Sequence, residues 1–433
     1  MSHQSLPGFR DFFPEDLAVR AQIFAAWRRV AVRYGFEEYD GPPLEAQDLY
    51  TEKSGPEIVG QLYNFVDKGG RQVALRPEMT PTLARMVASR ANGLRKPIRW
   101  FSIGQMFRYE RQQRGRLREH FQLNCDLIGE TGPLGDAEVI ALLIDVAREL
   151  GLGADEVRVR LSDRRVLAAL LRAAGVTEEQ LPLAYAAIDK SERLDRAALE
   201  ALLAAEGAGL APAVIGRVLD IRAIHGLEHA REALAGVPGA GAALAPLQQT
   251  LDALAAMGVA DFVDVDLTIV RGLAYYTGTV FELFDAGRSL RAIAGGGRYD
   301  DLLDRLGGVA LPAVGFAMGD VVIGELLKEH GALTKAGPVL DVFVAGVTAD
   351  DQPHVLALAH ECRDAGLRTE FALTVQAVGK QLKQADARGA RVAVLIGPDD
   401  RARNEVQLKD LAAKTQRSVS RDDAVAALLA TRS

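Results

Sequence analysis

Apolar residues recur at helical spacing in two stretches near the start of the chain. In residues 15–34, large apolar side chains from Leu17 to Val30 repeat every three to four positions, and Gly35 follows. Positions three and four residues apart share one face of an α-helix, so this pattern predicts an amphipathic helix that ends at the glycine. A similar spacing in residues 136–150 predicts a second helix.

Strand patterns flank a long helical segment. Residues 157–161 alternate between apolar side chains and arginine, which predicts a strand with one face in water, and strand patterns return at residues 262–269 and 275–284. Between them, residues 164–259 are rich in alanine, leucine and charged residues in helical order. We therefore expect a helical insertion between strands that belong to one sheet.

The pattern changes again after a predicted linker at residues 331–337. The chain then alternates between strands and helices, at 339–344, 354–365, 368–373, 377–388 and 391–396. The last strand contains an entirely apolar run, which is typical of a strand buried on both faces. We expect a separate α/β domain at residues 339–433 with a largely parallel sheet, after a first domain at residues 1–330.

Composition indicates a soluble globular chain. The 433 residues are 48% hydrophobic and 25% charged, which is typical of folded domains. The start of the chain resembles neither a signal nor a transit peptide, and no apolar run is long enough to cross a membrane. Cys125 and Cys362 lie far apart, so we expect reduced thiols, no protein-bound metal and a cytoplasmic protein.

Charge is unevenly distributed. The net charge of −7 argues against a nucleic-acid partner, because binding phosphates requires an excess of lysine and arginine. Residues 95–118, however, hold eight basic residues and one acid, Glu110. A basic patch on an acidic body is typical of a specific polyanion site.

The basic stretch contains the first candidate site. Strand-like runs at residues 98–103 and 120–128 flank residues 107–119, which predicts a hairpin with a long basic loop. The planar fork of arginine grips a phosphate at two points, so Arg108 at the strand end is a candidate for a nucleotide phosphate, with the loop arginines facing RNA. A solvated charged hairpin is the alternative.

Two further stretches carry candidate chemistry. Residues 76–81 form a polar cluster that enters a helix, where Thr80 or its neighbours could simply cap the helix. Residues 270–278 are paired with residues 294–300, which contain three successive glycines that would let the backbone approach a ligand closely. An ordinary turn would explain the glycines about as well.

Together these stretches resemble one family, the histidyl-tRNA synthetases, whose class has an antiparallel catalytic sheet. The resemblance covers nearly the whole chain and implies an α/β architecture with an α+β catalytic core. The motifs that carry it are residues 8–11 with Pro14, residues 35–45, residues 107–122, residues 271–276 and residues 295–300. The second of these resembles the dimer-interface motif of the class, so a homodimer is expected.

The resemblance implies a reaction and its residues. The enzyme would activate L-histidine with ATP, supplied with Mg²⁺, to histidyl-adenylate and pyrophosphate, and then transfer histidine to the 3′ end of its transfer RNA. Arg108 and Arg271 would be catalytic. Histidine would contact Glu78, Met79, Thr80, Arg108, Gln122, Asp126, Arg271, Tyr275 and Tyr276; ATP would contact Arg108, Glu110 and Arg271; the RNA would contact Arg111, Gln113, Arg114 and Arg116.

Two positions depart from the family pattern. Ala274 stands where the family usually has aspartate, and Val322 stands where the class places an arginine that meets the tail of ATP. The second departure keeps open the regulatory subunit of ATP phosphoribosyltransferase, which resembles a synthetase core that senses histidine. That subunit typically lacks the carboxy-terminal domain, whereas residues 378–385 here resemble an anticodon-binding domain. A pure RNA-binding module would have no use for the amino-acid site, and the insertion is expected to be an RNA clamp or a spacer.

Overall fold

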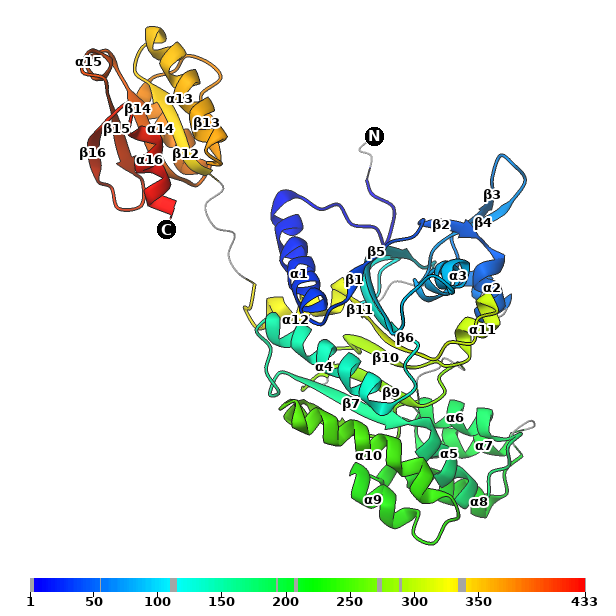
Figure 1. The fold of residues 1–433 in the computed structure, drawn as a ribbon. Helices are drawn as coiled ribbons and strands as arrows, with labels where there is room; N and C mark the ends of the chain where they lie inside the picture. The colour runs from blue at the N-terminus through cyan, green and yellow to red at the C-terminus, as the bar shows by residue number, and fades with distance from the viewer. Residues whose placement is uncertain are drawn as a thin grey trace. The chain divides into compact units, whose positions relative to one another are not determined.

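The computed structural model folds into two compact units, Met1–Leu333 and Thr334–Ser433 (Figure 1). The structure describes residues 4–54, 56–109, 115–191, 194–205, 209–270, 275–287, 290–333 and 340–432. Each unit has its own buried apolar core. In the described part of the chain, no helix is long and apolar enough to cross a membrane.

An eight-stranded sheet forms the centre of the first unit. Its order is β1 (Glu37–Glu38), β5 (Ile98–Phe107), β6 (Glu119–Ile128), β11 (Ala313–Gly319), β10 (Ala294–Arg298), β9 (Thr279–Asp285), β7 (Val157–Asp163) and β8 (Val263–Val265). Every pair from β5 to β7 is antiparallel, and only the outer pairs β1/β5 and β7/β8 are parallel. The expected antiparallel catalytic sheet and the interruption of that sheet by a long insertion are therefore confirmed.

Long helices cover this sheet, and the two predicted from spacing are present. They are α1 (Pro14–Arg33) and α4 (Pro133–Glu149), which pack against each other. Gly35 adopts a φ of +74°, which a residue with a side chain rarely adopts, and it ends the first helical segment as predicted. Trp27 is completely buried in the core that α1 shares with the sheet.

A smaller layer lies beside the end of β5, where the Phe107 backbone donates to the Arg76 carbonyl. It consists of a three-stranded antiparallel sheet in the order β2 (Leu44–Ala46), β4 (Gln72–Leu75) and β3 (Asn64–Val66), with α2 (Asp48–Ser54), the 3₁₀ helix η1 (Pro56–Gln61), α3 (Thr80–Arg90) and α11 (Leu302–Gly307). Helices α3 and α11 pack together. The predicted hairpin is the pair β5/β6, in which Phe107 faces Glu119.

The predicted insertion is helical. It contains α5 (Arg164–Ala173), α6 (Leu181–Asp189), α7 (Arg196–Ala204), α8 (Pro212–Asp220), η2 (Ile221–Ala223), α9 (Gly226–Ala233), α10 (Ala240–Ala256) and η3 (Ala260–Phe262). Helix α10 lies alongside α4 of the catalytic core (Figure 1). The two strand patterns that follow this segment, at residues 262–269 and 275–284, predicted longer strands than the structure contains, because β8 spans only three residues and β9 begins at Thr279.

The prediction that β7 has one face in water is wrong. Arg160 is 5% exposed, forms an ion pair with the buried Asp266 and lies over the ring of Phe284. A buried charge is tolerated when a partner and hydrogen bonds compensate for lost water. At position 160, the alternating arginine therefore faces a buried carboxylate instead of water.

The second unit is an α/β domain with a mixed sheet. The strand order is β13 (Thr369–Phe371), β12 (Leu340–Gly346), β14 (Ala390–Ile396), β15 (Glu405–Asp410) and β16 (Gln416–Ser420), accompanied by η4 (Ala349–Asp351), α13 (Gln352–Asp364), α14 (Val378–Ala387), α15 (Pro398–Ala402), α16 (Ala424–Leu429) and η5 (Ala430–Arg432). The predicted helices and first three strands are present, and those strands are parallel. The sheet is less parallel than predicted, because β15 and β16 add two antiparallel pairs.

Candidate active site

A cavity of 840 Å³ opens over the eight-stranded sheet and gathers most of the predicted site residues. Its wall contains side chains from the hairpin, from the start of α3, from β9 to β11 and from α12 (Asp320–Glu329). The predicted residues that line it are Glu78, Thr80, Arg108, Arg116, Gln122, Asp126, Tyr275 and Tyr276. Chain segments nearly 200 residues apart therefore meet at one pocket.

The segment that carries Glu78 and Thr80 is held by a buried arginine. Arg76 is 4% exposed; its Nε donates to the Gln105 carbonyl at 2.9 Å, and its guanidinium also pairs with Asp40 at 2.7 Å. Met79 is fully buried beneath this turn and is not among the cavity-lining residues. The structure thus places Met79 behind the site, where it supports its two neighbours.

The helix-cap interpretation of Thr80 is wrong. Thr80 is the first residue of α3, the N-cap position is Met79, and no side chain there makes a capping hydrogen bond. Since a threonine stabilises a helix start only from the N-cap position, this side chain is available to the cavity that it lines.

Arg108 lies at the end of β5 and connects the hairpin to the Glu78 segment. Its Nε donates to the Pro77 carbonyl at 2.9 Å, and its backbone N–H donates to the Arg118 carbonyl at 2.9 Å. These contacts fix the root of the side chain while it lines the cavity. The guanidinium is therefore positioned to bind an anion in the pocket.

Residues 8–11, the first family motif of the chain, contact the same end of the hairpin. Arg10 forms ion pairs with Glu119 at 2.6 Å and with Asp320 at 3.0 Å, and Asp320 accepts a hydrogen bond from the Phe121 backbone. Gly8 accepts from the Arg118 backbone at 3.0 Å. Burial raises the pKa of Asp320, and Arg10 beside it opposes that rise. These contacts connect the motif to β6 and α12.

An acidic end of the cavity is built around Asp126. This carboxylate is 4% exposed and accepts a hydrogen bond from the Tyr299 hydroxyl. Burial, followed by the neighbouring Asp126, raises the pKa of Tyr299 well above its usual value, so the phenol remains a donor at neutral pH. The ring of Tyr275 lies 4.8 Å from that of Tyr276 and 6.1 Å from that of Tyr299, and these rings form an aromatic wall beside the carboxylate.

The three successive glycines lie in a strand, so the turn interpretation is wrong. They occupy the middle of β10, between β9 and β11. A methyl carbon built on Gly296 would lie 2.2 Å from the Gly315 carbonyl oxygen, and one on Gly297 would lie 2.6 Å from the Thr279 carbonyl oxygen. Only glycine fits between these strands, and the close packing shapes the floor of the cavity.

His120 lines the cavity as a neutral imidazole. Desolvation by the surrounding protein, with further contributions from Arg108 and Arg10, lowers its pKa to about 3. The ring is therefore uncharged at physiological pH and can donate or accept one hydrogen bond at each nitrogen according to its tautomer. Sequence reasoning did not single out this residue.

Some predicted residues cannot be placed. Arg271 and Ala274 lie outside the described residues, and so do Glu110, Arg111, Gln113 and Arg114 of the basic loop. Among the described residues, no group of three or more histidine, cysteine, aspartate or glutamate side chains could hold a metal ion.

The cavity also contains residues that sequence reasoning missed. Glu282 on β9, Tyr299 after β10 and Arg291 before β10 line it, and Asp189 at the end of α6 brings the insertion to the same wall. Tyr299 lies inside the triple-glycine motif, so that motif could have indicated it. Nothing in the local sequence of Asp189 signals a role in the pocket.

Comparison with known proteins decides the family. The family model described as "Histidyl-tRNA synthetase" matches residues 8–320, and an "Anticodon binding domain" model matches residues 341–431. The histidine--tRNA ligase of Opitutus terrae is 46% identical over 97% of this chain and 96% of that protein. The chain belongs to the histidyl-tRNA synthetase family. The predicted enzyme class, an aminoacyl-tRNA ligase for histidine, is confirmed with it.

Solved structures agree with this family assignment. The structure of histidyl-tRNA synthetase from Nostoc sp. PCC 7120 has a TM-score of 0.84 and 26% identity, with all of both chains covered. A Bacillus halodurans protein described as an ATP phosphoribosyltransferase regulatory subunit/histidyl-tRNA synthetase shares the fold, with a TM-score of 0.75 and 23% identity over 92% of this chain and 99% of that chain. The regulatory subunit is not favoured, because the synthetase relative matches both units.

Proposed function

We propose that the cavity binds histidine at its acidic end and the phosphates of ATP at its hairpin end. Glu78 and Asp126 would meet the ammonium group of histidine, Thr80 and Gln122 would contact other parts of the amino acid, and the Tyr275–Tyr276 wall would hold the imidazole. The observation that supports this division is the strand register. Asp126 pairs with Gly315 and Gln122 pairs with Gly319, so the pocket extends along β6 from the carboxylate toward Arg108.

The proposed chemistry needs no side-chain nucleophile. A carboxylate oxygen of histidine attacks the α-phosphorus of ATP, a new phosphorus–oxygen bond forms, and pyrophosphate leaves to give histidyl-adenylate. A hydroxyl at the 3′ end of the transfer RNA then attacks the carbonyl carbon, and AMP leaves. Arg108 would bind the α-phosphate and stabilise the charge that builds there, a role that usually makes a large contribution to catalysis. Arg271 would contact the same phosphate and Glu110 the nucleotide.

Histidine-dependent exchange of pyrophosphate into ATP tests the activation step. Arg108→Ala is expected to lower the exchange rate by roughly 10² to 10³ while changing histidine binding much less, because its contact strengthens in the transition state. Arg90→Ala, at the exposed end of α3, is the control and should exchange normally. An Arg108→Ala protein that exchanges at the normal rate would contradict the assignment.

We infer that both units contact the transfer RNA. The second unit matches an anticodon-binding model, and this match supports a role in RNA binding for residues 339–433. The basic loop with Arg111, Gln113 and Arg114 would contact the acceptor end, together with Arg116. The protein with Arg111→Ala and Arg114→Ala should aminoacylate more slowly than the unmodified protein, and its aminoacylation should depend less steeply on salt, while pyrophosphate exchange persists. Equal loss of both steps would contradict this role.

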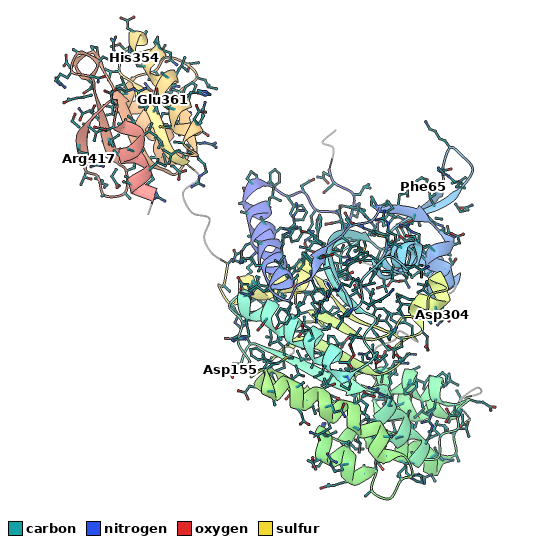
Figure 2. All side chains as sticks on the ribbon, in the orientation of Figure 1. Phe65, Asp155, Asp304, His354, Glu361 and Arg417 are labelled. Carbon is teal, nitrogen blue, oxygen red and sulfur yellow. The ribbon has the colours of Figure 1, made fainter. Side chains whose placement is uncertain are left out.

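We further propose a cytoplasmic homodimer that pairs through the amino-terminal region. The small sheet exposes apolar side chains that a monomer would leave in water: Leu44 is 39% exposed, Phe65 51% and Val66 56% (Figure 2). Pairing of identical patches about a two-fold axis is the commonest oligomer. Light scattering should give the mass of a dimer at micromolar concentration, and Phe65→Asp should shift it toward the monomer.

A further inference from the structure

The valine at position 322 leaves an apolar patch where a nucleotide tail is expected. Val322 is 8% exposed, belongs to the apolar core of the first unit and lines the cavity together with Val321. The outer phosphates of ATP carry most of its negative charge, and an apolar wall offers them no hydrogen-bond donors. A cationic side chain from another element must therefore reach this end of the pocket if ATP is to bind there.

One arginine lies near Gly115, the residue of the hairpin loop that also lies near Val322. A methyl carbon built on Gly115 would lie 3.4 Å from Val322 Cγ2 and 3.9 Å from Arg291 Cδ. Both side chains line the cavity. Because both atoms lie within 4 Å of one point, Arg291 and Val322 approach the same part of the cavity wall.

The sheet register places Arg291 at the phosphate end of the pocket. Arg291 comes three residues before Ala294, the first residue of β10, and Ala294 pairs with Met318 at the end of β11. Gly319, the next residue, pairs with Gln122 on β6, whereas Asp126 pairs with Gly315 four residues earlier. At about 3.3 Å per strand residue, the two ends are separated by roughly 13 Å. Arg291 is thus remote from Asp126 and close to the hairpin end.

The arginines that line the cavity also lie at its hairpin end. Among the described lining residues, the arginines are Arg108, Arg116 and Arg291. Arg108 follows the last residue of β5 and Arg116 follows Gly115, so all three belong to the hairpin end. Arg291 is exposed, so it can approach a bound nucleotide without unpacking the core.

We propose that Arg291 binds the outer phosphates of ATP and takes over the role of the arginine expected at position 322. This inference rests on the proposed ATP-dependent activation of histidine. The guanidinium can grip two phosphate oxygens at once, which a lysine cannot do. Arg291 acts on the β- and γ-phosphates, while Arg108 acts on the α-phosphate where the new bond forms.

Nucleotide binding by the full chain tests this role without relying on catalysis. Arg291→Ala should weaken ATP binding, measured by titration calorimetry, by about 10- to 100-fold, the usual effect of losing a hydrogen bond to a charged group. AMP, which lacks the outer phosphates, should bind both proteins equally. Arg305→Ala on α11, an exposed arginine outside the cavity, is the matched control and should bind ATP normally. Unchanged ATP affinity in Arg291→Ala, or equal losses for ATP and AMP, would overturn the proposal.

A reciprocal substitution tests the exchange of positions. Val322→Arg added to Arg291→Ala should recover at least a tenth of the ATP affinity that Arg291→Ala loses. In pyrophosphate exchange, the added Val322→Arg should lower the KM for ATP with little change in the KM for histidine. A double variant that keeps the normal melting temperature but binds ATP no better than Arg291→Ala would overturn it. If the unmodified protein binds ATP through Arg291 but exchanges no pyrophosphate, the proposed function fails and the phosphate site stands.

Discussion

A single methyl group at Gly315 should damage both the sheet and the proposed histidine site. Gly315 lies on β11 directly opposite Asp126 of β6. A methyl carbon there would lie 2.1 Å from Asp126 Oδ1 and 2.8 Å from the Cys125 carbonyl oxygen. The carboxylate cannot simply turn away, because the Tyr299 hydroxyl holds it. Gly315→Ala must therefore separate two central strands or displace Asp126.

The size of the effect follows from the crowding. Forcing an extra methyl group into a closely packed interior typically costs about 1–3 kcal/mol, which for a unit of this size lowers the melting temperature by about 2 to 6 °C. Displacing Asp126 would remove a charged contact to the ammonium group of histidine, which corresponds to a rise of about 10- to 100-fold in the KM for histidine. The KM for ATP should change much less.

A second glycine of the same unit supplies the control. A methyl carbon on Gly324 in α12 would lie 3.7 Å from Ile23 Cδ1, an ordinary contact, and alanine is favoured over glycine inside a helix by about 0.5–1 kcal/mol. Gly324→Ala should therefore raise the melting temperature slightly and leave both KM values unchanged. The reasoning is refuted if Gly315→Ala melts at the normal temperature and binds histidine normally.

Two other predictions concern buried charge and acid. Arg298 is 2% exposed and pairs with the buried Asp136 at 3.0 Å. Arg298→Met should therefore lower the unfolding free energy in urea by about 3–5 kcal/mol. Adding Asp136→Asn should recover part of this loss, because the unpaired carboxylate is then removed. The pKa of His120 falls from 6.5 to about 3 in the folded state, so the unfolded state takes up the proton first and stability should fall as the pH drops from about 6.5 toward 3. His120→Asn should flatten that part of the stability profile, and an unchanged profile would contradict the stated pKa.

Much of the architecture was predictable from local patterns. The long helices, the hairpin and the helical insertion follow from periodicities that each element carries within itself. The mixed sheet of the second unit was only partly predictable, because β15 and β16 are short and polar on one face and carry no buried apolar run. Strand direction also depends on connections that a local pattern does not encode.

The residues of the candidate site were likewise only partly predictable from the sequence. The family resemblance brought Glu78, Gln122 and Asp126 together as candidates, and all three line the cavity, although their roles remain a proposal. The pairing of Arg160 with Asp266 was not predictable, because the partners lie 106 residues apart. An arginine that alternates with apolar residues gives the same sequence pattern whether its side chain contacts water or a carboxylate. Arg291 escaped notice because its role depends on β10 starting beside the end of β11.

The parallel pairing of β7 with β8 limits how far this enzyme can be trimmed. In that pair Val159 faces Val263 and Leu161 faces Val265, so the chain leaves β7 at one end and must re-enter β8 at the other. A crossover of this kind needs an element that travels back along the sheet. Helix α10, about 25 Å long, makes this return while it packs on α4 and α5. A miniaturised version could shorten α7 to α9, but it would have to retain α6, which brings Asp189 to the cavity wall, and α10, which returns the chain along the sheet.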